Sequence, residues 1–387
     1  MRAETKLLTD HKPYADKYFL RANEILKAKG LNPWVNMQVF VRKGPGKAAG
    51  IDEAVDYILN HSNLEEVGGR IYGKREGQDY VGKETQMNII VPIQEIVELE
   101  TGYLGVIARA VTKTNGGGNL DFAAIGKQMR EVVALVGSRP VLYFGARHWH
   151  YEEDKALARL AFENGIREVA TDNGAKDFGK WGVGTIPHSL ENIFAWKYGV
   201  DRAIVESTKA FDRVIPENIP RVALIDYANR EITDSLATAR ELNGNLAAVR
   251  VDTCGENLAE GGVIGDRKYW QGNGVTVEGV YALRRALNEN GFENVGIYLS
   301  SGFSNPEKVR AFNEGERRYG IKLYDGIGAG FLDGVRCATA DVVAVGNCAD
   351  EVDFYTGDGV GPKNIIHKVG RPPRPNNGLD LLVGSAA

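Results

Sequence analysis

The chain has few cysteines, little net charge and no long apolar run, and each shortage argues against a class of protein. Its three cysteines, Cys254, Cys337 and Cys348, form no C-x-x-C pair, so we expect no cysteine-based zinc site. The net charge of −4 disfavours nucleic acid or a membrane surface as partner. No apolar run reaches the roughly 18 residues of a membrane span, and residues 1–19 lack an apolar signal core. We therefore expect a cytoplasmic protein.

The remaining composition is that of an ordinary globular protein. Hydrophobic residues make up 43% and charged residues 25% of the chain, proportions that are usual for folded domains. A length of 387 residues allows two domains and a large core. Glycine is abundant, at 47 residues, which indicates many tight turns and some loops able to hold phosphate.

The first part of the chain mixes helical and strand patterns. These patterns predict helices over 17–30 and 51–62, an alternating strand over 36–46, strands broken by glycines over 71–105, and a loop over 112–122. The proline-rich tail is unsuited to regular structure, and we expect it to pack back on this part. We predict an α+β domain of residues 1–115 that residues 350–387 complete.

From residue 116 to residue 349 the pattern becomes a repeat of apolar strand and amphipathic helix. Strands are predicted at 140–147, 166–173, 182–188, 221–227, 246–253, 295–302, 322–330 and 341–347. Buried strands that alternate with helices indicate a parallel α/β sheet. The number of units favours an α/β barrel of the TIM type, with an open doubly wound sheet as the alternative.

Polar residues gather where the predicted strands end. In a barrel the catalytic residues lie at the carboxyl ends of the strands, so each end is informative. In chain order these ends carry Arg147, His148 and His150; Thr171, Asp172 and Asn173; Thr185 and His188; Asp226; Arg250 and Asp252; Ser300, Ser301 and Gly302; and Gly328, Ala329 and Gly330. One such end is ordinary turn chemistry, but seven together predict a large polar site.

Several members of this set allow two interpretations. Arg147 follows the run VLYFGA and could grip phosphate through its planar guanidinium, or could be a plain surface cation. Arg250 and Asp252 lie two residues apart on one side of a strand. That pair suits one substrate, with arginine on phosphate and aspartate on hydroxyls or Mg²⁺. Asp226 could bind substrate or cap the helix that follows. The glycines of 326–330 could be turns or a phosphate loop.

His188 is one of only six histidines and follows Gly184 and Thr185 at the start of a predicted helix. A histidine at a helix start is often only a polar surface residue. Here anion-binding strand ends surround it, and a neutral imidazole is a good nucleophile toward phosphoryl groups. A helix N-terminus would also favour a phosphate attached to it. We therefore predict that His188 is transiently phosphorylated.

Taken together, these segments resemble the nicotinate phosphoribosyltransferases, which are type II phosphoribosyltransferases, and most of all their short archaeal and bacterial forms. The resemblance covers almost the whole chain. Its segments, in order, are DKYFLRANEILKAKGLNPWV, ELETGYLG, YFGARHWH, ATDNGAK, GVGTIPHSL, ALIDYANREITDSLATARELNG, VRVDTCGENLAEGG, LSSGF, GIGAG and HKVGR. The resemblance implies an irregular α/β barrel with an N-terminal α+β domain completed by the C-terminal tail.

The same resemblance implies an activity and a set of site residues. The family transfers a phosphoribosyl group from 5-phosphoribosyl-1-pyrophosphate (PRPP) to nicotinate, with Mg²⁺, and couples the reaction to ATP through a phosphohistidine that matches His188. Phe144 would stack on the pyridine ring, and Tyr18 would close the ring site of a neighbouring subunit, which implies a homodimer or larger homo-oligomer. The expected catalytic residues are His188, Arg250 and Asp252. The expected substrate-binding residues are Tyr18, Phe144, Arg147, Thr171, Asp172, Thr185, Asp226, Ser301, Gly302, Gly328 and Gly330.

The chain departs from the family pattern at positions that bear on the base. Asp172 replaces a frequent serine, and an aspartate would repel the carboxylate of nicotinate but accept from the amide of nicotinamide. His148 replaces a second arginine. Nicotinamide is therefore the alternative base, whereas quinolinate fits poorly because its two carboxylates need a strongly basic pocket. A non-enzymatic alternative is a sensor that binds a mononucleotide or phosphosugar.

Overall fold

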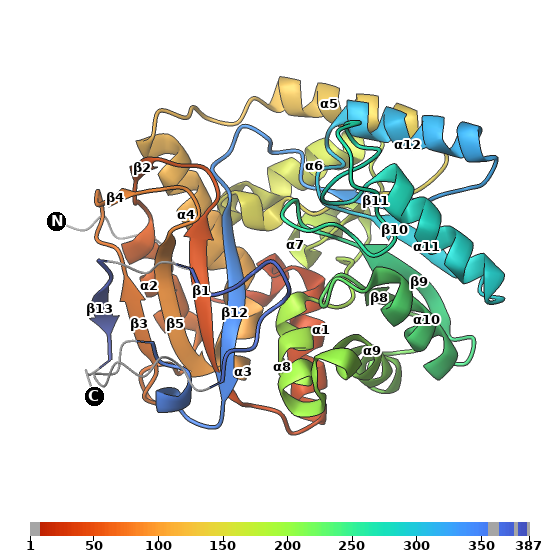
Figure 1. Ribbon diagram of the computed structural model, residues 1–387. Helices are drawn as coiled ribbons and strands as arrows, with labels where there is room; N and C mark the ends of the chain where they lie inside the picture. The colour runs from red at the N-terminus through yellow and green to blue at the C-terminus, as the bar shows by residue number, and fades with distance from the viewer. Residues whose placement is uncertain (1–7, 355–363, 375–377, 385–387) are drawn as a thin grey trace.

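The computed structural model describes residues 8–354, 364–374 and 378–384, so parts of the predicted tail segment 350–387 lie outside the described residues. Two sheets organise the chain, one of five strands and one of six (Figure 1). A small ribbon pairs β2 (Gly46–Lys47) with β4 (Asp79–Tyr80). Within the described ranges, no helix is both long and apolar enough to cross a membrane.

The five-stranded sheet forms the N-terminal domain and has the order β12-β1-β5-β3-β13. Its strands are β1 (Trp34–Val41), β3 (Arg70–Gly73), β5 (Thr85–Pro92), β12 (Ala338–Gly346) and β13 (Asp380–Val383). Side chains alternate along β1: Val35, Met37 and Val39 join the apolar core, while Asn36 and Gln38 donate to backbone carbonyls of the C-terminal part. The tail therefore completes this domain, as predicted.

Helices cover the apolar face of this sheet and share its core. They are α1 (Lys17–Ala28), α2 (Ile51–His61), α3 (Ile93–Ile96) and α4 (Glu100–Thr114). The first two confirm the predicted helices, but the prediction of strands throughout 71–105 is wrong from residue 93 onward. Gly102 and Gly105, which were predicted to break strands, instead let α4 approach its neighbours closely.

Gly105→Ala is expected to destabilise the protein. A Cβ at this position would lie 2.1 Å from the carbonyl oxygen of Trp149, and a backbone atom cannot rotate away as a side chain can. We expect the free energy of unfolding to fall by about 3 kcal/mol in urea denaturation. Gly118→Ala is the control because it meets no heavy atom within 4 Å, and it should change stability by less than about 0.5 kcal/mol. Equal stability of the two variants would contradict this account of the α4 contact.

The six-stranded sheet is parallel throughout, has the order β7-β6-β11-β10-β9-β8, and curls into an α/β barrel wall (Figure 1). Its strands are β6 (Val141–Tyr143), β7 (Glu168–Val169), β8 (Arg221–Leu224), β9 (Leu246–Val251), β10 (Gly296–Leu299) and β11 (Gly326–Ala329). The connecting helices are α5 (Phe122–Val136), α6 (Asp154–Glu163), α7 (Asp172–Ala175), α8 (His188–Tyr198), α9 (Ala203–Val214), α10 (Glu231–Glu241), α11 (Val277–Glu289) and α12 (Pro306–Tyr319). The predicted barrel of strand–helix units is confirmed.

The barrel is irregular because the predicted strand at 182–188 forms no regular ladder. The segment nevertheless crosses the opening between β7 and β8. Its Val183 N–H donates to the carbonyl of Val169 at 2.9 Å, and its Thr185 hydroxyl donates to the carbonyl of Val222 at 2.9 Å. This crossing carries the chain directly to the first residue of α8, His188.

The predicted strand at 341–347 is a strand, but its assignment to the barrel is wrong. It forms part of β12, which pairs antiparallel with β1 over Trp34–Val41 in the N-terminal sheet. Its apolar residues Val342 and Val345 enter the core that α1, α2 and α4 share. Sequence pattern does not distinguish these placements, because a buried strand has the same composition in either sheet. β12 therefore links the barrel to the N-terminal domain.

Candidate active site

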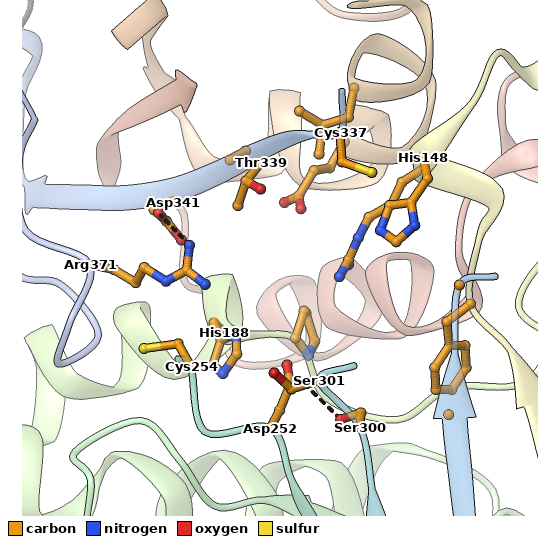
Figure 2. A pocket seen from close by; sticks show the side chains of 18 of the residues that line it. His148, His188, Asp252, Cys254, Ser300, Ser301, Cys337, Thr339, Asp341 and Arg371 are labelled. Carbon is orange, nitrogen blue, oxygen red and sulfur yellow. Dashed lines mark hydrogen bonds and ion pairs between the residues drawn. The ribbon is translucent and has the colours of Figure 1, made fainter. Parts of the chain in front are cut away.

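A cavity of about 350 Å³ lies between the carboxyl ends of the barrel strands and the N-terminal sheet. This volume is within the range of small-molecule sites. Figure 2 shows Thr339 and Asp341 of β12 facing His188 and Asp252 across the cavity. Ten of the predicted site residues line it: Tyr18, Phe144, Arg147, His188, Arg250, Asp252, Ser301, Gly302, Gly328 and Gly330. These ten residues, predicted from separate strand ends and motifs, therefore meet at one cavity in the folded chain.

His188 begins α8 and takes part in a buried charge network. Its Nε2 lies 2.8 Å from Oδ1 of Asp226, whose side chain is fully buried, while 28% of the His188 side chain is exposed. The other carboxylate oxygen of Asp226 forms a 2.7 Å ion pair with Nζ of Lys368, which is also buried. Burial opposes the charge of Asp226, but Lys368 and His188 hold its pKa well below the usual range.

This network determines which nitrogen of His188 carries the proton and which can react. A charged Asp226 favours a proton on Nε2 of the imidazole. The lone pair then lies on Nδ1, where an electrophile can be attacked. Asp226 does not line the cavity, and the N-cap position of α10, the next helix, is Arg230 rather than Asp226. The helix-cap interpretation of Asp226 is therefore wrong, and its direct contact with substrate has no support in this geometry, since its carboxylate is bound to His188 and Lys368.

Arg147 lies in a pocket of acidic and phenolic groups from the N-terminal domain. It donates to the hydroxyl of Tyr18, which in turn donates to Asp16 at 3.0 Å. Burial opposes the charge of Arg147, but Tyr18, Asp16 and Glu100 raise its pKa above the ordinary value. Arg147 is therefore a permanent cation at the cavity wall. Tyr18 lies in the cavity of its own chain, so this residue gives no reason to require a neighbouring subunit.

Arg250 and Asp252 lie at the end of β9, on the same side of the strand, as predicted. The Arg250 guanidinium lies 5.9 Å from the centre of the Phe144 ring, and Asp252 accepts from the Ser300 hydroxyl at 2.8 Å. A flat aromatic ring beside a guanidinium can hold a planar, electron-poor ligand by stacking. The pair thus places a cation, a carboxylate and an aromatic face around one part of the cavity.

Close packing by itself explains why Gly328 and Gly330 are glycines. A Cβ at Gly328 would lie 2.5 Å from the Phe144 ring, and one at Gly330 would lie 2.5 Å from His148. Burial, with help from Arg147, lowers the pKa of His148 to about 3, so it is neutral and does not replace a second arginine. Gly328 and Gly330 therefore make room for the cavity wall, whatever further contacts they make with a ligand.

Three other predicted residues lie outside the cavity lining and have structural partners. The Thr171 hydroxyl donates to Asp154 and caps α7, while Thr185 bonds to the barrel backbone. Asp172 forms a 2.6 Å ion pair with Lys17 and accepts from the N–H of Gly182 at 2.8 Å. The prediction that these side chains bind substrate has no support in this geometry.

Sequence reasoning missed several charged residues that line the cavity. These are Arg42, Glu100, Asp341, Lys368 and Arg371. Burial raises the pKa of Glu100 to about 8, so at pH 7 it is largely neutral. The family-like segments ELETGYLG and HKVGR contained Glu100, Lys368 and Arg371, which was the available signal. Together with Arg147 and Arg250, the cations outnumber the charged carboxylates, so the cavity suits a polyanion.

The fold matches solved structures of nicotinate phosphoribosyltransferases. The structure of nicotinate phosphoribosyltransferase from Vibrio cholerae aligns with a TM-score of 0.62 at 11% identity, covering 86% of this chain and 86% of that one. The one from Porphyromonas gingivalis aligns with a TM-score of 0.59 at 15% identity, covering 92% and 89%. No protein-family model matches the sequence, and no curated protein matches it. This chain therefore has the fold of the nicotinate phosphoribosyltransferases: an irregular α/β barrel with an N-terminal domain that the C-terminal tail completes.

Proposed function

We propose that this protein is an ATP-coupled nicotinate phosphoribosyltransferase of NAD salvage, which makes nicotinate mononucleotide and pyrophosphate from nicotinate and PRPP. The observation that carries the proposal is the network of His188, Asp226 and Lys368 at the wall of an electropositive cavity. A simple phosphosugar sensor needs cations, but it has no need of a histidine whose nucleophilic nitrogen is set by a buried aspartate.

Some cavity residues would hold the two substrates, and others would stabilise the charges that develop during the transfer. The ring nitrogen of nicotinate forms a bond to C1 of the ribose as the bond from C1 to pyrophosphate breaks. Phe144 and Arg250 would hold the ring and the phosphoribosyl group, which keeps the reacting atoms in line. Arg147 would stabilise the developing charge on the leaving pyrophosphate. Because positive charge develops on the ribose at the same time, the Asp252 carboxylate beside it is favourable.

Mg²⁺ fits this site as a partner of the substrate. Ligand atoms of His188, Asp226 and Asp252 lie within 4.8 Å of one another. His188 and both oxygens of Asp226 are already engaged, which leaves Asp252 as the available carboxylate. Proteins usually hold Mg²⁺ with one or two carboxylates and substrate phosphates, so this donor set is sufficient. When bound, the ion would neutralise charge on the pyrophosphate.

ATP would act through His188. Attack of Nδ1 on the γ-phosphoryl group forms a nitrogen–phosphorus bond as the bond to ADP breaks, and later hydrolysis returns the free imidazole and phosphate. The N-terminus of α8 would favour the added negative charge. Lys368 keeps Asp226 charged, so the imidazole tautomer is maintained through the cycle.

The position of Asp172 supports nicotinate over nicotinamide. An aspartate facing the ring would favour an amide and repel a carboxylate, but this carboxylate is committed to Lys17 and Gly182. The five cations at the cavity wall suit a base with its own negative charge.

The test is formation of mononucleotide from PRPP and Mg²⁺ with nicotinate or nicotinamide, each with and without ATP. We expect nicotinate mononucleotide, in greater amount with ATP. Reaction with nicotinamide alone would show that the proposed base is wrong. Binding of PRPP without product from either base would favour the sensor. The predicted homo-oligomer is checked separately by analytical ultracentrifugation.

A further inference from the structure

A buried lysine lies against the loop that follows β10. Lys308 is in the first turn of α12 and is only 8% exposed. Its Nζ donates to the carbonyl of Ser301 at 2.8 Å and lies 4.6 Å from the centre of the Phe303 ring. A Cβ on Gly302 would be 3.8 Å from the same nitrogen. The ammonium group therefore bonds to Ser301, lies over Phe303 and is close to Gly302, although Lys308 is not among the residues that line the cavity.

The loop has a backbone conformation that needs support. Ser301 and Gly302 have φ values of 66° and 84°, so two consecutive residues are in the left-handed region. That region is unfavourable for serine by roughly 1–2 kcal/mol. Ser300 is tied to Asp252 at 2.8 Å, and the Asn305 N–H bonds to the carbonyl of Gly302 at 3.3 Å. Lys308 holds the Ser301 carbonyl between these points.

This anchor fixes the direction of one peptide group. In a trans peptide the C=O and the following N–H point in opposite directions. The carbonyl of Ser301 points toward Lys308, so the N–H of Gly302 points away from it, and Gly302 is a cavity residue. A backbone N–H in a tight turn, close to the N-terminus of the 14-residue α12, is suited to hold a phosphate oxygen.

We propose that Lys308 is a positioning residue that orients the Ser301–Gly302 peptide so that the Gly302 N–H binds a phosphate group of the substrate. The identity of that substrate as PRPP rests on the proposed function. Lys308 does not touch the phosphate itself. It holds the Ser301 carbonyl, and its positive charge lies on the side of the loop away from the cavity. Neutral side chains at this position would leave the Ser301 carbonyl without its charged partner.

The charge state of Lys308 gives this role a measurable signature. Burial lowers the pKa of Lys308 to about 8, and the field of Asp252 only partly opposes this. The other nearby acids are engaged elsewhere: Glu307 pairs with Lys268, and Asp333 accepts from Ser304. A bound phosphate favours the protonated lysine. We therefore expect affinity for the phosphate to fall as the pH rises from 7 to 9.

The test compares Lys308→Met, Lys308→Arg and Lys268→Met in the full-length chain. Titration calorimetry with PRPP and Mg²⁺ gives Kd at pH 7 and pH 9, and steady-state assays give KM and kcat. For Lys308→Met at pH 7 we expect Kd and KM for PRPP to rise about tenfold or more, with a much smaller change in kcat. Lys308→Arg should restore part of the affinity and remove the weakening at pH 9. Lys268→Met removes an exposed lysine near the same helix end and should match wild type.

Each result has one meaning. Unchanged Kd and KM for PRPP in Lys308→Met, or a loss of kcat alone, would overturn the inference and leave the proposed function in place. If wild type binds inorganic phosphate in a Lys308-dependent way but does not bind PRPP, the loop role stands and the proposed function fails. Binding of neither ligand overturns both. If Lys308→Met does not fold, the pH dependence of Lys308→Arg decides, and an unaltered dependence overturns the inference.

Discussion

Replacing His188 with alanine is expected to abolish the stimulation of mononucleotide formation by ATP. Without the imidazole there is no nitrogen to accept the phosphoryl group, so the rate with ATP should become equal to the rate without it. Slow transfer from PRPP should persist, because Arg147, Arg250 and Asp252 remain at the cavity wall. The measurement is the initial rate of nicotinate mononucleotide formation at saturating PRPP, with and without ATP.

His148→Asn is the matched control for this prediction. His148 also lines the cavity, but burial keeps it neutral, and among the described contacts it has no carboxylate partner like Asp226. The control should therefore retain a higher rate with ATP than without it. Incubation with γ-labelled ATP should label the wild type and His148→Asn but not His188→Ala. Persistent ATP stimulation in His188→Ala would exclude the phosphohistidine mechanism.

Replacing Asp226 with asparagine is expected to reduce both stability and ATP coupling. The substitution removes the negative charge between His188 and Lys368, and it leaves a buried ammonium group without its counter-ion. Loss of one partner of a buried pair typically costs about 3–5 kcal/mol in the free energy of unfolding. The imidazole also loses the acceptor that fixes its proton on Nε2, so ATP stimulation should fall. Urea denaturation and the same rate assay measure the two effects.

The pH dependence of this stability loss follows from the sign of the shift. The pKa of Asp226 is lower in the folded state than in the unfolded chain. Its contribution is therefore fully present above the unfolded value of about 3.9 and is lost as the pH falls below it. The stability difference between wild type and Asp226→Asn should therefore be large near pH 7 and should shrink in acid. Growth of the difference below pH 4 would contradict this assignment.

Asp252→Asn distinguishes the buried pair from a general effect of a lost carboxylate. Asp252 is partly exposed in the cavity and accepts from Ser300, which an asparagine oxygen can replace. We expect stability close to wild type and a large loss of transfer, because Asp252 is proposed to act on the ribose and Mg²⁺. A stability loss as large as that of Asp226→Asn would show that the buried ion pair is not the cause.

Local sequence pattern was sufficient for most of the fold. The helical spacing before Gly30 and the strand–helix repeats after residue 116 are determined by neighbours within one or two turns, so they were predicted correctly. The errors arose where a distant partner decides. Gly102 and Gly105 were misinterpreted because their reason is close packing against other elements. The strand at 341–347 pairs with β1, about 300 residues away.

The site residues likewise include some that local sequence predicts and some that depend on distant partners. The sequence by itself determined that polar residues such as His188, Arg250 and Asp252 follow buried strands, and parallel strands bring such ends to one edge. Only the tertiary structure decided that Asp172 is neutralised by Lys17, and that Lys368 from the tail completes the network of His188. The physical reason is that a strand end has a local signature, whereas the partner of a charge is whichever opposite charge the fold places within about 3 Å of it.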